Sequence, residues 1–307
     1  MPRIILDTDP GIDDALALFL ALASPEVQLE AVTTVHGNVP VELTTRNALG
    51  LLELAERGDI PVARGSAYPL VRAPVDAKYV HGPTGLGTLT LPEPQTSVVK
   101  QSAADLIVER VLAAPGELTL VAVGPLTNLA LALRREPGIA AQVREVVIMG
   151  GALRVPGNIT PTAEFNIYAD PHAAHVVFKA GWPLRLVSLD VTNRTTVNRE
   201  QTRQLARQQS AISSTIEAML EFYFEVFAPT FGNNVLRLHD PLALAAAFNP
   251  DFIQWEPAYV DVELTGTLTF GETVAFFQRA GAPEPNMQVS GGVDAERFVA
   301  WFLERLG

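Results

Sequence analysis

Short apolar segments alternate with longer amphipathic segments along most of this chain. Short runs rich in β-branched residues predict buried strands, and longer runs with apolar positions three and four apart predict helices. Repeated alternation of the two indicates parallel strands covered by helices. The predicted strands are residues 3–6, 29–34, 60–63, 118–123, 145–149 and 184–189. The predicted helices begin near residue 12 and cover 41–57, 103–113, 129–135, 173–179, 199–227, 242–248 and 295–306, with a strand-rich stretch at 259–277.

This pattern predicts an α/β fold with a single open, largely parallel sheet covered by helices, a Rossmann-like core. A chain of 307 residues allows one large domain or two smaller ones. No Gly/Ser linker or shift in composition divides it, so we expect one domain over residues 1–307. Residues 67–98 are rich in proline, glycine and threonine and predict a long functional loop.

Four carboxylates stand between the first predicted strand and the first predicted helix, at Asp7, Asp9, Asp13 and Asp14. Side chains alternate along a strand, so Asp7 and Asp9 leave it on the same side. The start of a helix favours negative charge, which accounts for Asp13 or Asp14 singly. Four like charges this close raise one another's pKa unless a cation or a reaction uses them. A hard metal ion bound by oxygen atoms is the simplest explanation.

Other polar residues follow predicted strands or precede predicted helices. Taken singly, each has an ordinary structural explanation: turn formation for the asparagines, helix N-capping for Asp240, and burial with a partner for the lone histidines His81 and His239. Together they form a set of candidate site residues, which are Asn38, His81, Asn158, Glu164, Asn166, His239 and Asp240.

Composition and charge exclude several classes of protein. The formal net charge of −12 argues against a nucleic-acid partner, whose phosphates would be repelled. The absence of cysteine excludes disulfides and thiolate metal sites. No apolar run predicts a membrane span, and the N-terminus enters a strand without a leader-like segment. We therefore expect a cytoplasmic protein without a membrane partner.

Most familiar catalytic motifs do not occur in the sequence. There is no P-loop, G-x-S-x-G or H-E-x-x-H, and the glycines at residues 82–87 lack a strand–turn–helix context. Asp7 and Asp9 form a D-x-D pattern like that of haloacid-dehalogenase-type phosphatases. However, Pro10 and Gly11 follow where that family has threonine and an apolar residue, and no phosphate-binding basic loop is visible. A metal-dependent phosphatase is therefore an alternative interpretation.

The first carboxylate segment, DTDPGIDDA at residues 7–15, resembles the signature of the nucleoside hydrolases, the inosine/uridine-preferring N-ribohydrolase family. Further blocks resemble those of the family in the same order, and together they cover essentially the whole chain. They are VHGN at 35–38, GPLTN at 124–128, MGG at 149–151, AEFN at 163–166, LDVT at 189–192, HDPL at 239–242, GETV at 271–274 and VD at 293–294.

The resemblance implies one bound Ca²⁺ in an open α/β fold. By motif, the carboxylates of Asp9, Asp14 and Asp240 and the backbone carbonyl of Val123 would bind the metal, and Asp7 would support the site without touching it. Ca²⁺ accepts six to eight oxygen ligands, so this set leaves positions for a water and the ribose diol.

The resemblance also assigns the substrate-binding and catalytic residues. Asp13 would take a proton from the water that attacks C1′, and His239 or His81 would assist the departing base. The candidates for stacking on the base are Phe165, Tyr223, Phe227 and Phe231. The expected sugar and base contacts are Asn38, His81, Met149, Asn158, Glu164, Phe165 and Asn166.

The expected function is calcium-dependent hydrolysis of the N-glycosidic bond of ribonucleosides to ribose and free base. The substrate would be a pyrimidine nucleoside (uridine or cytidine), inosine, or both. The resemblance implies a homo-oligomer, either a homodimer or a homotetramer. Besides the phosphatase, a non-enzymatic nucleoside- or ribose-binding protein is an alternative with the same pocket.

Overall fold

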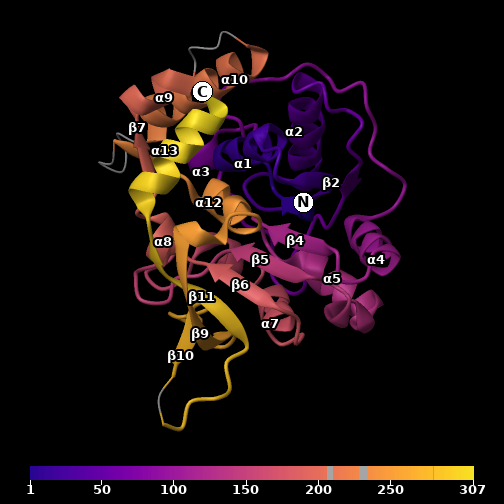
Figure 1. The fold of residues 1–307 in the computed structure, drawn as a ribbon, viewed down its shortest axis with the longest axis vertical. Helices are drawn as coiled ribbons and strands as arrows, with labels where there is room; N and C mark the ends of the chain where they lie inside the picture. The colour runs from indigo at the N-terminus through magenta and orange to yellow at the C-terminus, as the bar shows by residue number, and fades with distance from the viewer. Residues whose placement is uncertain (206–209, 228–233, 279) are drawn as a thin grey trace.

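The structure is a computed structural model that describes residues 1–205, 210–227, 234–278 and 280–307 (Figure 1). Its described residues form a nine-stranded sheet in the order β10-β9-β11-β6-β5-β4-β1-β2-β3. Neighbours from β11 to β3 pair in parallel, and β9 and β10 add an antiparallel edge. The strands are β1 (Arg3–Thr8), β2 (Gln28–Thr34), β3 (Val62–Arg64), β4 (Leu118–Ala122), β5 (Glu145–Met149), β6 (Leu184–Val187), β9 (Ile253–Val262), β10 (Thr273–Phe277) and β11 (Met287–Val293).

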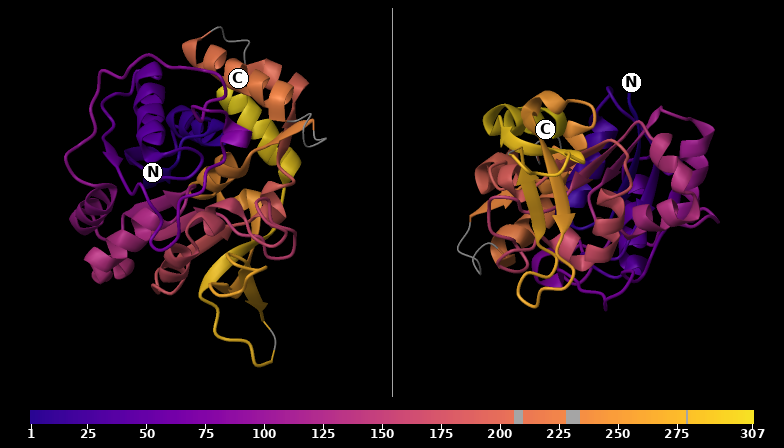
Figure 2. Two further views of the ribbon diagram at one scale, coloured as in Figure 1. Left: turned by 180° about the vertical axis from the view of Figure 1, so that it is seen from behind. Right: turned by 90° about the horizontal axis from the view of Figure 1, so that it is seen from below.

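Helices cover both faces of this sheet, which confirms the predicted α/β class (Figure 2). In β1, Ile4 and Leu6 belong to one apolar core and Ile5 to the other, as expected for a strand buried on both sides. The first core contains residues of α1 (Ile12–Ala23), α2 (Val41–Leu54), α10 (Ala211–Phe222), α12 (His239–Ala246) and α13 (Ala295–Leu306). The second contains residues of α4 (Ala103–Ala113), α5 (Thr127–Arg135) and α7 (Pro171–Phe178).

Two of the differences between predicted and observed helix bounds bear on the site. The segment 199–227 divides into α9 (Arg199–Leu205), α10 and a π-helix, η3 (Tyr223–Phe227), with 206–209 outside the described residues. The predicted helix 242–248 begins earlier, because α12 starts at His239. Its Pro241 is tolerated in the first turn, where a backbone N–H has no partner within the helix.

The earlier start of α12 makes the predicted N-cap role of Asp240 wrong. Leu238 occupies the N-cap position, and Asp240 lies within the first helical turn. Its carboxylate is therefore not used to close the helix end. It lines a cavity instead, as described below.

The predicted loop 67–98 contains one short helix, α3 (Lys78–His81), and no strand among its residues. It passes outside the sheet between β3 and α4 (Figure 1). A separate two-stranded sheet pairs β7 (Thr196–Asn198) with β8 (Val235–Arg237). The remaining short elements are η1 (Pro137–Ala141), α6 (Phe165–Ala169), α8 (Leu189–Thr192) and η4 (Pro250–Phe252).

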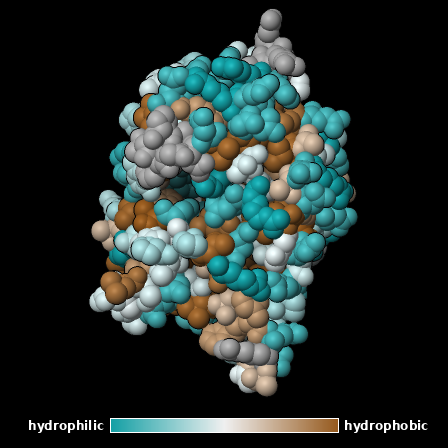
Figure 3. Space-filling model, turned by 90° about the vertical axis from the view of Figure 1, so that its left-hand side faces the viewer, coloured by the Kyte–Doolittle hydropathy of each residue, from teal (hydrophilic) through white to brown (hydrophobic). Residues whose placement is uncertain are grey.

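Apolar side chains are scattered among hydrophilic ones on the face drawn in Figure 3. Among the side chains that the structure describes, the most exposed large apolar one is Leu268, at 86%. Within the described parts of the chain, no helix combines the length and apolar character needed to cross a bilayer.

Candidate active site

A cavity of about 500 Å³ lies at the carboxyl ends of the central parallel strands. Open α/β sheets bind ligands at this edge. Val123 directly follows β4, Met149 ends β5, and Asn38 lies in the connection after β2, and all three line the cavity. The sequence-predicted residues that line it are Asp13, Asn38, His81, Val123, Met149, Asn158, Glu164, Phe165, Asn166, Tyr223, His239 and Asp240.

The turn from β1 into α1 fixes the carboxylate of Asp14. One of its oxygens accepts from the Thr8 hydroxyl and the Asp9 backbone N–H. The other accepts from the Gly11 backbone N–H and the Asn38 amide, both at 2.9 Å. Asp14 is the third residue of α1, and its bond back to Gly11 is one half of a capping box. Local backbone geometry therefore sets the direction of this carboxylate.

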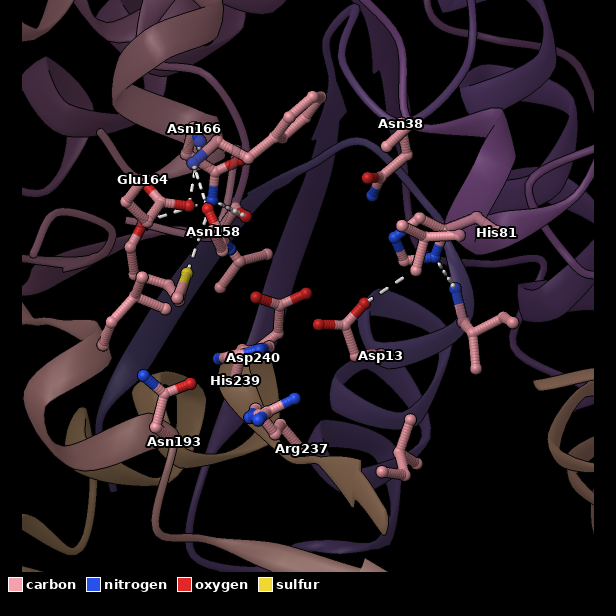
Figure 4. Close-up of a pocket in the computed structure, with 18 of the residues that line it drawn as sticks. Asp13, Asn38, His81, Asn158, Glu164, Asn166, Asn193, Arg237, His239 and Asp240 are labelled. Atoms are coloured by element: carbon pink, nitrogen blue, oxygen red, sulfur yellow. Dashed lines mark hydrogen bonds and ion pairs between the residues drawn. The ribbon is translucent and has the colours of Figure 1, made fainter. Parts of the chain in front are cut away.

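Asp13 precedes Asp14 on α1 and points into the cavity (Figure 4). Asp13, Asp14 and Asp240 each place a carboxylate oxygen within 4.8 Å of the other two, and we call these three residues the carboxylate cluster. Burial, together with the charge of Asp14, raises the pKa of Asp13 to about 8. Burial and the neighbouring carboxylates also raise the pKa of Asp240. The cluster is thus a place where a cation would be strongly favoured.

Asp9 lies behind this cluster and does not line the cavity. Its Oδ2 accepts from the backbone N–H of Asn38 at 2.6 Å, while its buried Oδ1 has no hydrogen-bond partner among the described residues. A Cβ at Gly37 would lie 2.0 Å from Asp9 Oδ2, and one at Gly124 would lie 2.4 Å from Oδ1. The two glycines therefore provide the space that the carboxylate occupies.

A polar wall formed by Asn158, Glu164 and Asn166, here called the amide wall, stands on one side of the cavity (Figure 4). Glu164 caps α6 by accepting from the backbone N–H of Asn166, and also accepts from that of Gly151. Asn158 Oδ1 accepts from the backbone N–H of Phe165 at 2.8 Å. Backbone donors therefore hold the wall rigid. Burial raises the pKa of Glu164.

The carbonyl of Val123 is an oxygen acceptor at the edge of the amide wall. It accepts from Asn166 Nδ2 at 2.8 Å, and the same amide lies 3.3 Å from the Met149 carbonyl. The structure thus brings Val123, Met149 and Asn166 together, although they come from three separate sequence blocks.

His81 reaches the cavity from α3 in the long loop. Its Nδ1 accepts from the backbone N–H of Ile12 at 3.0 Å, which assigns the proton of the neutral ring to Nε2. Burial lowers its pKa to about 4. A Cβ at Gly11 would lie 2.6 Å from Nδ1, so the close approach of the ring requires glycine there. His81 is therefore a neutral hydrogen-bond donor through Nε2.

His239 lies on the opposite part of the cavity, at the start of α12. Its Nδ1 is 2.7 Å from the Thr192 hydroxyl. Burial lowers its pKa to about 3, and the charge of Arg237 adds to this effect. Both candidate histidines are consequently neutral in the folded protein near pH 7.

Asp7 is buried beneath the site and does not line the cavity. Its Oδ1 accepts from the Thr33 hydroxyl and from Asn128 Nδ2, the latter at 2.8 Å. Burial raises its pKa to about 7. These contacts connect β1 to β2 and to the GPLTN block.

Five residues form a third side of the cavity, which we call the outer wall, and sequence reasoning identified it only partly. Tyr223 was a candidate for stacking and His239 for catalysis, whereas the other three were missed. Only closeness in sequence to the LDVT and HDPL blocks points to them. Of the other stacking candidates, Phe165 lines the cavity, and the Phe227 side chain and Phe231 lie outside the described residues. The outer wall consists of Asn193, Tyr223, Leu236, Arg237 and His239.

Comparison with known proteins agrees with this geometry. Residues 4–300 match the family model described as inosine-uridine preferring nucleoside hydrolase. The chain is 40% identical to the pyrimidine-specific ribonucleoside hydrolase RihA of Salmonella arizonae, covering 99% of this chain and 97% of that protein. It is also 40% identical to the inosine-uridine preferring nucleoside hydrolase of Leishmania major, covering 100% and 99%.

Solved structures give the same result. A plant nucleoside hydrolase superimposes with a TM-score of 0.93 at 36% identity. A purine-preferring ribonucleoside hydrolase from Gardnerella vaginalis superimposes with a TM-score of 0.94 at 34% identity, and each comparison covers 99% of this chain and 98% of the other. With the family model, the relatives and the cavity in agreement, the chain belongs to the inosine-uridine preferring nucleoside hydrolase family and is a hydrolase of N-glycosidic bonds.

Proposed function

We propose that this protein is a Ca²⁺-dependent ribonucleoside hydrolase that converts uridine, inosine or both to ribose and free base. The observation that carries the proposal is the buried carboxylate cluster facing a rigid amide wall across one cavity. The cluster suits a metal and an attacking water, and the amide wall suits sugar hydroxyls. Nucleosides are named as substrates of the Salmonella and Leishmania relatives.

The chain's own oxygen atoms support a calcium site. We assign Asp9, Asp14 and Asp240 as carboxylate ligands and the Val123 carbonyl as a fourth. The orphaned, buried Oδ1 of Asp9 is the kind of atom that a bound cation would satisfy. The donor set contains only oxygen, which Ca²⁺ prefers over softer ligands. When bound, the ion would position a water and lower its pKa.

Asp13 is the group that we assign to take the proton of the attacking water. It faces the cavity while Asp14 is turned into the fold by its four donors. General-base assistance of this type is worth about 10²–10⁴-fold in rate. The transition state would resemble an oxocarbenium ion, as in other glycoside hydrolysis.

The remaining lining residues would bind the substrate. Asn38 and the amide wall would hold the ribose hydroxyls, and Met149 would lie against the sugar. Phe165 would stack on the base, while His81 and His239 would assist its departure. A neutral imidazole with a proton on Nε2, the form that the Ile12 contact favours for His81, can donate a hydrogen bond to the base.

The cellular setting is part of the same proposal. We expect a cytoplasmic enzyme that acts as a homodimer or homotetramer, in one domain that spans residues 1–307. Sedimentation of the purified protein would measure its assembly.

The test is turnover of a nucleoside panel before and after metal removal. We expect release of ribose from uridine or inosine, loss of activity and of thermal stability after chelation, and recovery of both with Ca²⁺, since a ligand that binds only the folded state stabilises it. Full activity with metal analysis showing an empty site would refute the calcium assignment. Absence of turnover on every nucleoside would refute the proposed function.

A further inference from the structure

Arg237 brings a permanent positive charge into a cavity dominated by carboxylates. It ends β8, where it pairs with Thr196 of β7, and lies two residues before His239. Among the described residues that line the cavity, it is the only lysine or arginine. The guanidinium remains charged at any physiological pH and has donors but no acceptor. Its preferred ligand in the cavity is therefore an anionic or carbonyl oxygen.

Its position separates it from the predicted sugar contacts. Figure 4 shows Arg237 close to His239, with the amide wall on the far side of Asp240. The charge of Arg237 also acts on His239, since it lowers the pKa of that imidazole. If the amide wall holds the ribose, as in the proposed function, the base bonded to C1′ extends toward the outer wall.

We propose that Arg237 binds the exocyclic carbonyl oxygen of the nucleobase and stabilises the departing base anion, so that the enzyme prefers keto bases to amino bases. Uracil and hypoxanthine present a carbonyl oxygen where cytosine and adenine present an amino group. A guanidinium can donate a hydrogen bond to that oxygen. It cannot form one with the amino group, because both groups are donors. The substrates selected are thus uridine and inosine over cytidine and adenosine.

The reaction gives the guanidinium a second role. The C1′–N bond breaks, and its electron pair remains on the base. The water oxygen forms the new bond to C1′, and its proton passes to Asp13. The negative charge on the base delocalises onto the exocyclic oxygen, which Arg237 would contact, until the base accepts a proton from solvent. A charged donor stabilises this anion more than it stabilises the neutral base. It therefore lowers the activation barrier for cleavage of the C1′–N bond.

Two other roles for Arg237 predict different behaviour. As a phosphate-binding group, it would favour nucleotides, yet the carboxylates of Asp13, Glu164 and Asp240 line the same cavity and repel phosphate. As a charge that only offsets the carboxylates, it would affect all substrates alike. Preference among bases is therefore the property that separates the proposal from both.

The experiment compares Arg237→Gln and Arg237→Lys with wild type on uridine, cytidine, inosine, adenosine and p-nitrophenyl riboside. For Arg237→Gln, we expect kcat/KM to fall about 10- to 100-fold on uridine and inosine, the range of one charge-assisted hydrogen bond. Cytidine, adenosine and the nitrophenyl riboside should change much less. Arg237→Lys keeps the charge and should retain part of the keto preference. Arg135→Gln on α5, whose side chain is 58% exposed, is the matched arginine control.

The wild-type measurements separate failure of this inference from failure of the proposed function. Wild type that cleaves no nucleoside refutes both. Wild type that cleaves uridine and cytidine equally, or Arg237→Gln with equal losses on all five substrates, refutes only the role of Arg237. Wild type could instead show a higher kcat/KM on uridine 5′-phosphate than on uridine. If both variants lose that difference, Arg237 binds phosphate and the proposal is overturned. Thermal melting checks folding, and Arg237→Lys carries the test if Arg237→Gln is unstable.

Discussion

The carboxylate cluster and the outer wall line one cavity but are built in different ways. Asp14 is held by backbone and side-chain donors from within six residues of it and by Asn38, at the end of a strand buried on both faces. The outer wall combines the segment after α8, the π-helix η3, the short strand β8 and the start of α12. These outer-wall residues come from separate elements outside the central parallel strands.

This difference indicates which part of the cavity carries out the reaction and which part sets the preference among bases. Asp13 and Asp14, which share one strand-to-helix turn, can keep one geometry while the outer wall varies. Two proteins that are 40% and 34% identical to this chain carry names with different base preferences, pyrimidine-specific and purine-preferring. We therefore expect changes at the cluster to affect every substrate and changes at the outer wall to affect some.

The largest expected effect concerns the sugar, which the proposed function places on the cluster side of the cavity. The ribose diol would complete the metal shell, so a 2′-deoxynucleoside loses a metal contact and leaves buried polar groups unpaired. Sites built to bind a hydroxyl reject the analogue that lacks it by about 10⁴-fold or more. The measurement is kcat/KM for uridine against 2′-deoxyuridine, and equal values would rule out this binding geometry.

The next effect is expected at Asp13. Asp13→Asn is nearly isosteric but cannot accept the proton of water, so kcat should fall about 10²–10⁴-fold. The loss should be similar on uridine, inosine and p-nitrophenyl riboside, because water activation is common to all three. Metal content measured on the variant serves as the control. A near-normal kcat with metal retained would remove Asp13 from this role.

A selective effect is expected at the two histidines. His81→Ala and His239→Ala should each lower kcat on uridine and inosine, by roughly 10²-fold for the residue that assists the base. The nitrophenyl riboside should be spared, because its leaving group departs readily as an anion. Losses confined to uridine in His81→Ala would mark a contact that reads pyrimidines. Equal losses on all three substrates would instead indicate that the histidine shapes the cavity.

The smallest effect tests the buried support of the cluster side. His36 Nε2 lies 3.0 Å from the Thr127 hydroxyl, which donates to Asp170, and burial lowers the pKa of His36 from 6.5 to about 4. The unfolded chain then binds the proton more tightly than the folded protein. This contribution to stability is complete above pH 6.5 and is lost as the pH falls toward 4.

Urea unfolding of wild type and His36→Gln between pH 7.5 and 4 measures this contribution. The wild-type free energy of unfolding should decline more steeply across that window, by at most about 3 kcal/mol, since one pKa unit corresponds to about 1.4 kcal/mol. Carboxylates elsewhere titrate equally in both proteins and cancel in the comparison. Parallel pH profiles would show that His36 is not the source of the slope.

The sequence by itself determined the α/β class, the chain order of strands β1 to β6 and of the longer helices, and the position of the first carboxylates at a strand-to-helix turn. It did not predict β7, β8 or β11. The features that it determined depend on local information: the period of apolar residues, the turn at Pro10–Gly11, and acidic residues at a helix start. The helix at 295–306 agrees with the observed α13 for the same reason. The sequence blocks that resemble the nucleoside hydrolase family also contain many of the residues that line the cavity.

Only the tertiary structure decided which residues share the cavity. It showed that Asp14 points inward while Asp13 faces the cavity, and that Asp240 lies inside its helix. It also showed that burial keeps His81 neutral and that the Ile12 contact orients its ring. It also added Asn193, Leu236 and Arg237, which no motif marks. The physical reason is that the direction of a side chain and its burial depend on elements far away in the chain, and periodicity within one segment carries no information about them.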